Sequence, residues 1–282
     1  MDHEKGEMRM LTLELAQMSL VDGDIAGNLE KVITKIREAK STSDLIIFPE
    51  TCFSGFPTHD NAGDYSQSLD GEIVKALEKE AKAKGIAVLA GICEVENGHY
   101  YNSSVFIDAE KGHIATYRKT HMWLTDQGLF SPGDQFVALE WRGIRVGLLI
   151  CFDIEFPESG RANALLDADL LLVVNGNMDP YGETHRTAIK ARAQENQFYA
   201  AFVNRVGMDS FGHQFAGGSC VVDPFGQTLC EAGRDEMTLQ IAIDPLKRRE
   251  YQKDYHYLNE RALQYRHEIE IEGKSSVIKI PS

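Results

Sequence analysis

Residues 145–151 read RVGLLIC, an almost uninterrupted apolar run that ends on a cysteine, and residues 170–174 read LLLVV. Apolar runs without polar alternation are typical of strands that are buried on both faces. Residues 158–166, which lie between the two runs, have the composition of a helix. The stretch therefore predicts a strand–helix–strand unit, and such units are typical of α/β proteins in which helices cover sheets.

Strand and helix patterns alternate on both sides of this unit. Toward the N-terminus, the spacing of apolar residues predicts strands at residues 10–16, 45–48 and 86–93 and helices at residues 28–39 and 70–84. Further predicted strands occupy residues 101–108, 113–118, 136–141, 199–205, 219–223 and 237–243, and residues 185–197 have helical composition. This order fits helix-covered sheets better than a helix bundle or a sandwich without helices.

Length and composition place the chain among ordinary globular proteins. It has 282 residues, of which 43% are hydrophobic and 26% charged. We expect one domain over residues 1–250, followed by a C-terminal arm or tail at 251–282, because the chain becomes strongly charged after Pro245. From residue 247 onward we expect a helical arm, with the last ten residues disordered.

The charge and the cysteines narrow the classes of partner and compartment. A net charge of −14 disfavours binding to phosphate backbones, so we expect no nucleic-acid partner. The apolar runs are too short to cross a bilayer and the N-terminus lacks a signal-peptide pattern, so we expect a cytoplasmic protein without membrane attachment. Five cysteines without CxxC spacing indicate reduced thiols, and no HExxH pair is present, so we expect no metal.

Three predicted strands end on reactive side chains. Residues 45–50 (LIIFPE) end on Glu50, residues 115–119 (ATYRK) end on Lys119, and the run at 145–151 ends on Cys151. A carboxylate can accept the thiol proton, and an ammonium can stabilise the oxyanion that forms when the thiolate attacks a carbonyl. Together the three residue types suffice for acyl transfer.

Each of these residues also fits a structural role when it is considered alone. An isolated buried cysteine such as Cys151 is more often a core residue than a nucleophile. Glu50 fits a helix or turn cap after Pro49, and Lys119 fits an exposed lysine among polar neighbours. The spacing of the three residues does not distinguish a structural role from a catalytic one. The residues that flank them do distinguish the two roles.

The flanking residues resemble the signatures of the nitrilase, or carbon–nitrogen hydrolase, superfamily. The three signatures are Phe48-Pro49-Glu50, the segment YRKTH at 117–121, and the segment LICFDIEFPE at 149–158. Further matches lie at residues 130–134, 191–196, 217–219 and 223–226, so the resemblance runs from about residue 8 to about residue 245. Within the superfamily the chain is most similar to the bacterial R-stereoselective amidase type, through residues 175–182, 185–197, 203–207 and 231–236.

The resemblance implies a fold and a reaction. The fold is a four-layer αββα sandwich, in homodimers or larger assemblies to which the C-terminal segment contributes. The implied reaction is the hydrolysis of a small amide, aliphatic or of the amino-acid type, to carboxylic acid and ammonia through a cysteine thioester, without cofactor. Glu50 is the implied general base and Cys151 the nucleophile. Lys119 and the backbone N–H of Phe152 are the implied oxyanion donors.

A fourth acidic residue is common in the superfamily, as a glutamate six positions before the proline of a PG dipeptide. Counting back from Pro132 gives Asp126, which is one methylene shorter and fits an exposed loop residue equally well. For the substrate pocket, the loops after the motif strands suggest Phe56, Trp123, Asn175 and Met178, each of which also fits a packing role.

Other activities remain open from the sequence. Nitrile hydrolysis uses the same residues, and so does hydrolysis of N-carbamoyl amines by a pocket that accepts a urea-like group. A catalytically silent binding or assembly protein is the alternative outside enzymology, although all three reactive residues are present.

Overall fold

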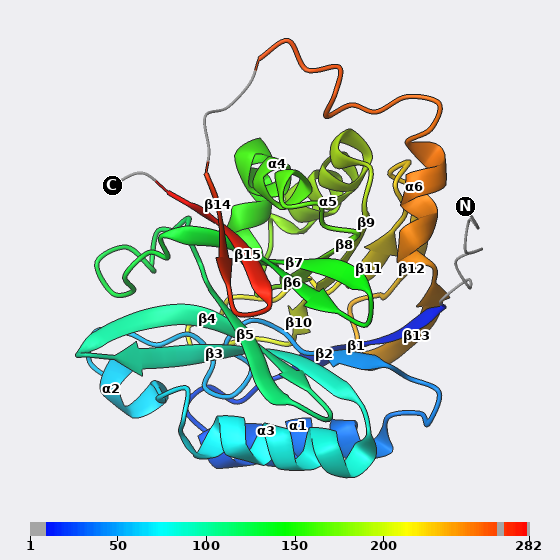
Figure 1. Cartoon of the computed structure of the whole chain (residues 1–282). Helices are drawn as coiled ribbons and strands as arrows, with labels where there is room; N and C mark the ends of the chain where they lie inside the picture. Colours follow the sequence, from blue (N-terminus) through cyan, green and yellow to red (C-terminus); the bar gives the residue numbers. More distant parts are fainter. Residues whose placement is uncertain (1–9, 264–267, 281–282) are drawn as a thin grey trace.

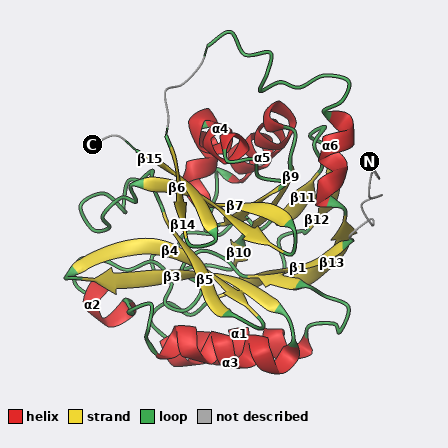
Figure 2. Ribbon diagram, viewed as in Figure 1, coloured by secondary structure: helices red, strands yellow, loops and turns green. Residues whose placement is uncertain are grey.

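The computed structural model describes residues 10–263 and 268–280 of the chain. Two sheets lie face to face, and helices cover the outer face of each, so that the four layers follow one another as helix, sheet, sheet and helix (Figure 1). Figure 2 shows the same layers by element type, with the long helices at the two outer surfaces of the paired sheets and the short α6 (Arg248–Tyr251) at one side. The four-layer αββα sandwich expected from the sequence is confirmed.

The first sheet has seven strands in the order β10-β1-β2-β3-β4-β5, with β13 also pairing with β1. Its strands are β1 (Leu11–Ser19), β2 (Leu45–Ile47), β3 (Ala87–Glu96), β4 (His99–Asp108), β5 (Gly112–Arg118), β10 (Arg205–Val206) and β13 (Met237–Ile243). The outer helices are α1 (Ile25–Glu38), α3 (Glu72–Lys84) and the short α2 (Ala62–Tyr65). Strands β1, β2 and β3 run parallel, which suits the helices that connect them.

The second sheet has eight strands in the order β12-β11-β9-β8-β7-β6-β15-β14. Its strands are β6 (Gln135–Trp141), β7 (Ile144–Ile150), β8 (Leu170–Val174), β9 (Tyr199–Val203), β11 (Cys220–Val222), β12 (Thr228–Glu231), β14 (Ile269–Glu272) and β15 (Ser275–Lys279). Helices α4 (Pro157–Leu165) and α5 (Gly182–Asn196) cover its outer face in Figure 1. Short helices η1 (Cys151–Glu155), η2 (Pro245–Lys247) and α6 (Arg248–Tyr251) complete the order.

Strand β2 shows why the apolar runs lack alternation. Leu45 and Ile47 belong to the core between the two sheets, whereas Ile46 and Phe48 belong to the core between the first sheet and its helices. Successive side chains of a strand point to opposite faces, so a strand in the middle of four layers must be apolar at every position. Each fully buried side chain of this size contributes about 1.5–3 kcal/mol.

The C-terminal segment differs from the expectation. Residues 248–251 form one short helix, but no helical arm follows in the described part of the segment, and β14 and β15 form a hairpin instead. Strand β15 pairs with β6, and Val277 and Ile278 are buried in the large hydrophobic core that includes both faces of the second sheet. The expected helix and the expected disorder of the last ten residues are therefore wrong for residues 273–280, because residues 275–279 pair with the edge of β6 and extend the second sheet. Residues 281–282 lie outside the described part of the chain.

The described residues contain neither a membrane-spanning helix nor a cluster of metal-ligating side chains. None of their helices combines the length and the apolar character needed to span a bilayer. Within the same residues, no three His, Cys, Asp or Glu side chains gather in a way that could hold a metal ion.

Candidate active site

The three reactive residues follow strands of both sheets. Glu50 lies in the turn after β2 and Lys119 follows β5 directly, both in the first sheet, whereas Cys151 follows β7 of the second sheet and begins η1. Cys151 has a φ of 47°, a left-handed conformation that is rare for residues other than glycine. Such backbone strain is found where a sharp turn must present a side chain. Here the turn places the thiol at the wall of a cavity.

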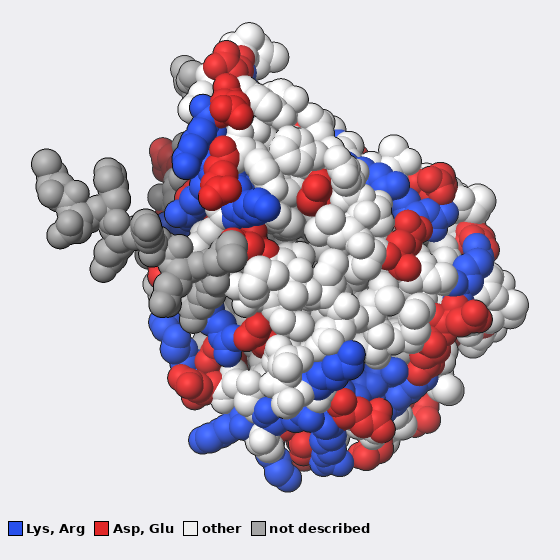
Figure 3. Space-filling model, turned by 90° about the vertical axis from the view of Figure 1, so that its right-hand side faces the viewer, with Lys and Arg blue, Asp and Glu red and all other residues white. Residues whose placement is uncertain are grey.

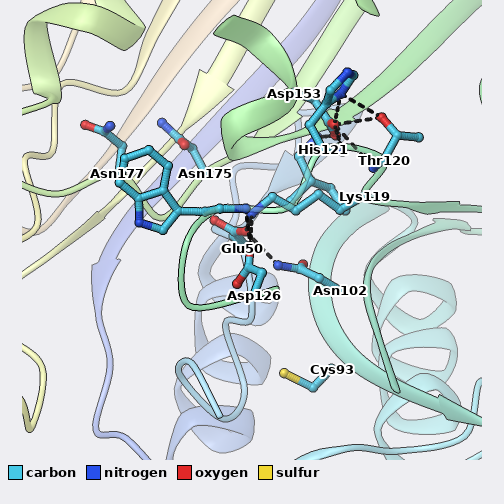
Figure 4. A network of polar contacts seen from close by, with 12 residues as sticks. Glu50, Cys93, Asn102, Lys119, Thr120, His121, Asp126, Asp153, Asn175 and Asn177 are labelled. Atoms are coloured by element: carbon cyan, nitrogen blue, oxygen red, sulfur yellow. Dashed lines mark hydrogen bonds and ion pairs between the residues drawn. The ribbon is translucent and has the colours of Figure 1, made fainter. Parts of the chain in front are cut away.

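Lys119 joins two carboxylates in a buried cluster (Figure 4). Its ammonium nitrogen lies 2.9 Å from Glu50 Oε1 and 2.7 Å from Asp126 Oδ2. All three side chains are almost fully buried. A buried ammonium is tolerated only when negative charge compensates it, and this cluster supplies two such charges. Asp126 is thus part of the cluster, not an exposed loop residue.

Asn102 on β4 orders this cluster and was not singled out by the sequence. Its side-chain amide donates to Glu50 Oε1 at 2.7 Å, and its backbone carbonyl accepts from the N–H of Lys119 at 2.8 Å. The other carboxylate oxygen of Glu50, Oε2, is buried without a hydrogen-bond partner in the described structure. An unpartnered buried oxygen of this kind is available to accept a proton. Asn102 is one residue among many polar strand positions, so only the fold reveals its place.

Asp153 ties the end of β5 to the turn after β7. One of its carboxylate oxygens accepts from the backbone N–H of His121 at 2.9 Å and from the Thr120 hydroxyl at 2.8 Å. The other accepts from the Tyr117 hydroxyl at 2.8 Å and from the backbone N–H of Ile150 at 3.1 Å. Because these donors come from both sheets, Asp153 fixes the distance between Lys119 and Cys151. Figure 4 shows part of this network beside the Lys119 cluster.

The cluster also sets the protonation of its members. Burial alone would lower the pKa of Lys119, but the negative charges of Asp126 and Glu50 outweigh it and hold that pKa well above its usual value. Burial raises the pKa of the Cys151 thiol, as does the nearby charge of Glu50, whereas Lys119 and the backbone N–H of Gly176 act in the opposite direction. The resting thiol is therefore protonated and needs a base before it can attack.

A cavity of about 360 Å³ opens above Cys151, Lys119 and Asp126. This volume lies at the small end of the range for small-molecule sites. Phe56, Trp123 and Met178 line the cavity, together with the backbone stretch around Phe152. These positions agree with the sequence expectation for the pocket loops.

Asn175 is the exception among the expected pocket residues. It is buried and does not line the cavity. Its backbone carbonyl accepts from the N–H of Glu50 at 3.2 Å, and its side-chain oxygen lies 3.1 Å from Nδ1 of His185. Asn175 therefore supports the turn of Glu50 from behind, because β8 ends one residue earlier and directs the side chain toward α5.

Several cavity residues were not found from the sequence. Asp209, Phe211 and His213 come from the turn that follows β10, and His185 comes from the first turn of α5. Glu155 also lines the cavity and lies 3.0 Å from Nε2 of His185. No local pattern marks these residues, because their proximity to Cys151 arises only when the sheets pack together.

Known proteins share this architecture. Residues 12–253 match the carbon–nitrogen hydrolase family. The chain is 47% identical to an (R)-stereoselective amidase of Pseudomonas sp., over 90% of this chain and 92% of that one. A carbon–nitrogen hydrolase superfamily protein of Xanthomonas campestris has a TM-score of 0.84 at 27% identity and covers 92% of this chain and 100% of its own.

A third relative bears on the cysteine. In the amidase from Nesterenkonia sp., a variant in which one glutamate is replaced by glutamine carries a covalent addition of the acetamide moiety of fluoroacetamide at the active-site cysteine. It is 26% identical, with a TM-score of 0.78, and covers 89% of this chain and 94% of its own. Given the two-sheet fold, the cluster of Glu50, Lys119 and Cys151 and the match over residues 12–253, the chain belongs to the carbon–nitrogen hydrolase family.

Proposed function

We propose that the protein is an amidase that converts a small carboxamide into the carboxylic acid and ammonia through a thioester at Cys151. The observation that carries the proposal is the buried cluster in which Lys119 joins Glu50 and Asp126, at the wall of a cavity that also exposes Cys151. The amidase names of the relatives from Pseudomonas and Nesterenkonia support the same reaction class.

In the first half-reaction, Glu50 accepts the proton of the Cys151 thiol through its unpartnered oxygen. The thiolate attacks the carbonyl carbon of the amide, and the oxyanion of the tetrahedral intermediate accepts hydrogen bonds from Lys119 and from the backbone N–H of Phe152. Glu50 then returns the proton to the departing nitrogen, the C–N bond breaks, and ammonia leaves. The acyl group remains on sulfur as a thioester.

In the second half-reaction, Glu50 accepts a proton from a water molecule, whose oxygen attacks the thioester carbonyl. The same two donors stabilise the second oxyanion. The C–S bond breaks, the sulfur takes back a proton from Glu50, and the carboxylic acid leaves. Both halves therefore use one base and one pair of oxyanion donors.

Asp126 is a positioning residue in this scheme. Its carboxylate lies 2.7 Å from the ammonium of Lys119 and also accepts from the backbone N–H of Trp123 at 3.2 Å. It thereby keeps Lys119 charged and fixes the loop that carries Trp123. The shorter aspartate reaches the lysine here because residues 123–126 form a tight turn.

The test is ammonia release from a panel of aliphatic amides, amino-acid amides in both configurations, nitriles and N-carbamoyl amines. We expect turnover of amides by the wild type, none by Cys151→Ala, and an acyl adduct of Cys151 in mass spectra of the quenched reaction. Turnover of nitriles or carbamoyl amines alone would reassign the substrate while keeping the thioester chemistry. If no compound of the panel releases ammonia, the result would favour a binding or assembly protein without catalytic activity.

We also propose that the protein forms a homodimer or larger homo-oligomer. Figure 3 shows the side of the molecule where β12, β13 and α6 lie in Figure 1, and the middle of this face is largely free of charged side chains. Exposed apolar side chains in or close to these elements in the sequence include Phe225, Leu229, Met237 and Tyr255. Sedimentation velocity with the wild type and with Leu229→Glu tests the proposal, and a monomer at micromolar concentration would contradict it.

The division into a domain at residues 1–250 and an arm at 251–282 is likewise a proposal, supported by the end of the family match at residue 253. In this division the arm returns to the domain, because β15 adds a strand to the second sheet. A cytoplasmic location is supported by the free cysteines of the described chain, since reduced thiols suit a reducing compartment. Deleting residues 251–282 and measuring oligomeric state tests the first, and cell fractionation tests the second.

A further inference from the structure

We infer that Glu155 is a specificity-determining residue that binds a protonated amine of the substrate, so that the enzyme prefers amides carrying a cationic amine a few bonds from the carbonyl. This inference rests on the proposed amidase function and names the substrate class of the same cavity.

The position of Glu155 relative to the nucleophile is set by one short helix. Cys151 is the first residue of η1 and Glu155 is the last. A helix of this type rises about 2.0 Å per residue, so the two residues are separated by about 8 Å along its axis. Both line the same cavity. A substrate whose carbonyl lies at Cys151 therefore has space for a short chain before it reaches Glu155.

The charge around the cavity favours a cation at this end. The basic residue that lines it, apart from histidines, is Lys119, and its charge is already compensated by Glu50 and Asp126. Asp209 is occupied, because it accepts from the backbone N–H groups of Phe211 and His213 and pairs with the His213 ring. Glu155 is the remaining acidic residue of the described lining, and its side chain is about one quarter exposed.

His185 holds the Glu155 carboxylate in a defined orientation. Nε2 of His185 lies 3.0 Å from Oε1 of Glu155, and the His185 ring is buried at the wall of the same cavity. A carboxylate only accepts hydrogen bonds, so Nε2 donates. The second oxygen of Glu155, Oε2, makes no hydrogen bond within the described structure and is available to a ligand. A carboxylate that is fixed on one side and open on the other suits an ammonium group.

Aromatic rings also line the cavity that contains Glu155. Trp123 meets Phe152 at a centroid distance of 5.0 Å and Tyr181 at 5.2 Å, both nearly edge to face. All three residues line the cavity with Glu155. Aromatic faces attract cations and do not donate to an anion, so they add to the selectivity of the carboxylate.

The experiment compares pairs of amides of equal shape and different charge: glycinamide with propanamide, β-alaninamide with butanamide, and 4-aminobutanamide with pentanamide. We expect the wild type to have a higher kcat/KM for the cationic member of at least one pair. In Glu155→Gln, which keeps an oxygen that accepts from His185, we expect that preference to fall about 10- to 100-fold, mainly through KM. The neutral member should change less than about threefold.

Asp209→Asn is the matched control, because it removes the same charge from the same cavity. We expect it to leave the preference within about threefold of the wild type. An equal loss for cationic and neutral amides in Glu155→Gln would show that Glu155 acts only by holding His185, and would overturn the inference. An unchanged preference would overturn it too.

A binding measurement separates this inference from the proposed reaction. In Cys151→Ala, calorimetry gives the affinity of each amide without turnover. Tighter binding of the cationic member, lost when Glu155→Gln is added, supports the inference even if the wild type proves to hydrolyse another carbon–nitrogen bond. Equal binding of both members overturns it even if amide hydrolysis is established.

Discussion

The floor of the cavity and its outer wall are built in different ways. The floor consists of Lys119 and Cys151, which follow strands directly, and Glu50 bonds to Lys119 from the turn after β2. All three residues have at most 9% of their surface exposed. The outer wall consists of loop residues such as Tyr181 and Phe211, which are 40% and 64% exposed. The floor is held by hydrogen bonds from both sheets, whereas the exposed wall residues have few fixed partners.

The same contrast occurs within a single turn. Asp153 is fully buried and accepts hydrogen bonds from both sheets, whereas Glu155, two residues later, contacts one histidine and faces the cavity. Rigid elements suit groups that must be placed within tenths of an ångström, and loops suit groups that select ligands. We infer that changes to the floor alter rate and stability, and that changes to the wall alter substrate affinity.

The largest effect is expected at the centre of the floor. Lys119→Met removes an oxyanion donor, which we expect to lower kcat about 10³-fold. It also leaves Glu50 and Asp126 buried without their cation, so the free energy of unfolding should fall by about 3–5 kcal/mol. Urea unfolding and amide turnover measure the two effects. Lys75→Met on the exposed face of α3 is the control, and similar behaviour of both variants would refute the role of the cluster.

A somewhat smaller effect is expected from Asp153→Ala. The change leaves the buried donors of Tyr117, His121 and Ile150 without an acceptor, so we expect about 3 kcal/mol of lost stability. Glu158→Ala, on an exposed carboxylate near the same turn, should change stability by less than about 0.5 kcal/mol. Equal unfolding midpoints for the two variants would mean that the sheets position Lys119 and Cys151 without Asp153.

An intermediate effect is expected at the border between floor and wall. Asp126→Asn removes one of the two negative charges that raise the pKa of Lys119 above 10.5. Charged Lys119 stabilises the folded protein at pH values below the pKa that this lysine has in the unfolded chain. That contribution is lost as the pH rises through the higher pKa that Lys119 has in the folded protein. In the variant this loss, and the alkaline fall of kcat, should begin at lower pH, with kcat reduced about 10- to 100-fold at pH 7. If the alkaline fall of kcat begins at the same pH in the variant and the wild type, Asp126 does not raise the pKa of Lys119.

The smallest effect is expected on the wall. Phe211→Ala changes a side chain that is mostly exposed, so we expect an unchanged Tm and kcat, and an increase in KM of about two- to threefold. Phe56→Ala is the comparison, because Phe56 lines the cavity but stacks on the buried Phe215 at 6.2 Å. A larger loss of kcat for Phe211→Ala than for Phe56→Ala would break the division between floor and wall, and would indicate a loop that closes over substrate.

Much of the fold could be predicted from local patterns. The apolar runs that end at Glu50 and Cys151 predicted their strands because burial on both faces leaves no room for polar alternation. The C-terminal segment could not be predicted in this way. Its Ser-Ser-Val-Ile stretch is short and follows a charged region, and only the open edge of β6 makes it a strand.

The sequence by itself determined the residue types at the strand ends, and with them the chemistry of thiol, carboxylate and ammonium. Tertiary structure decided which side chains meet: Asp126 joins Lys119, Asn102 orients Glu50, Asn175 turns away from the cavity, and Glu155 faces it. The physical reason is that strand patterns depend on neighbours a few residues apart. Contacts between Glu155 and His185, or between Asn102 and Glu50, depend on how two sheets pack and on the turns at their ends.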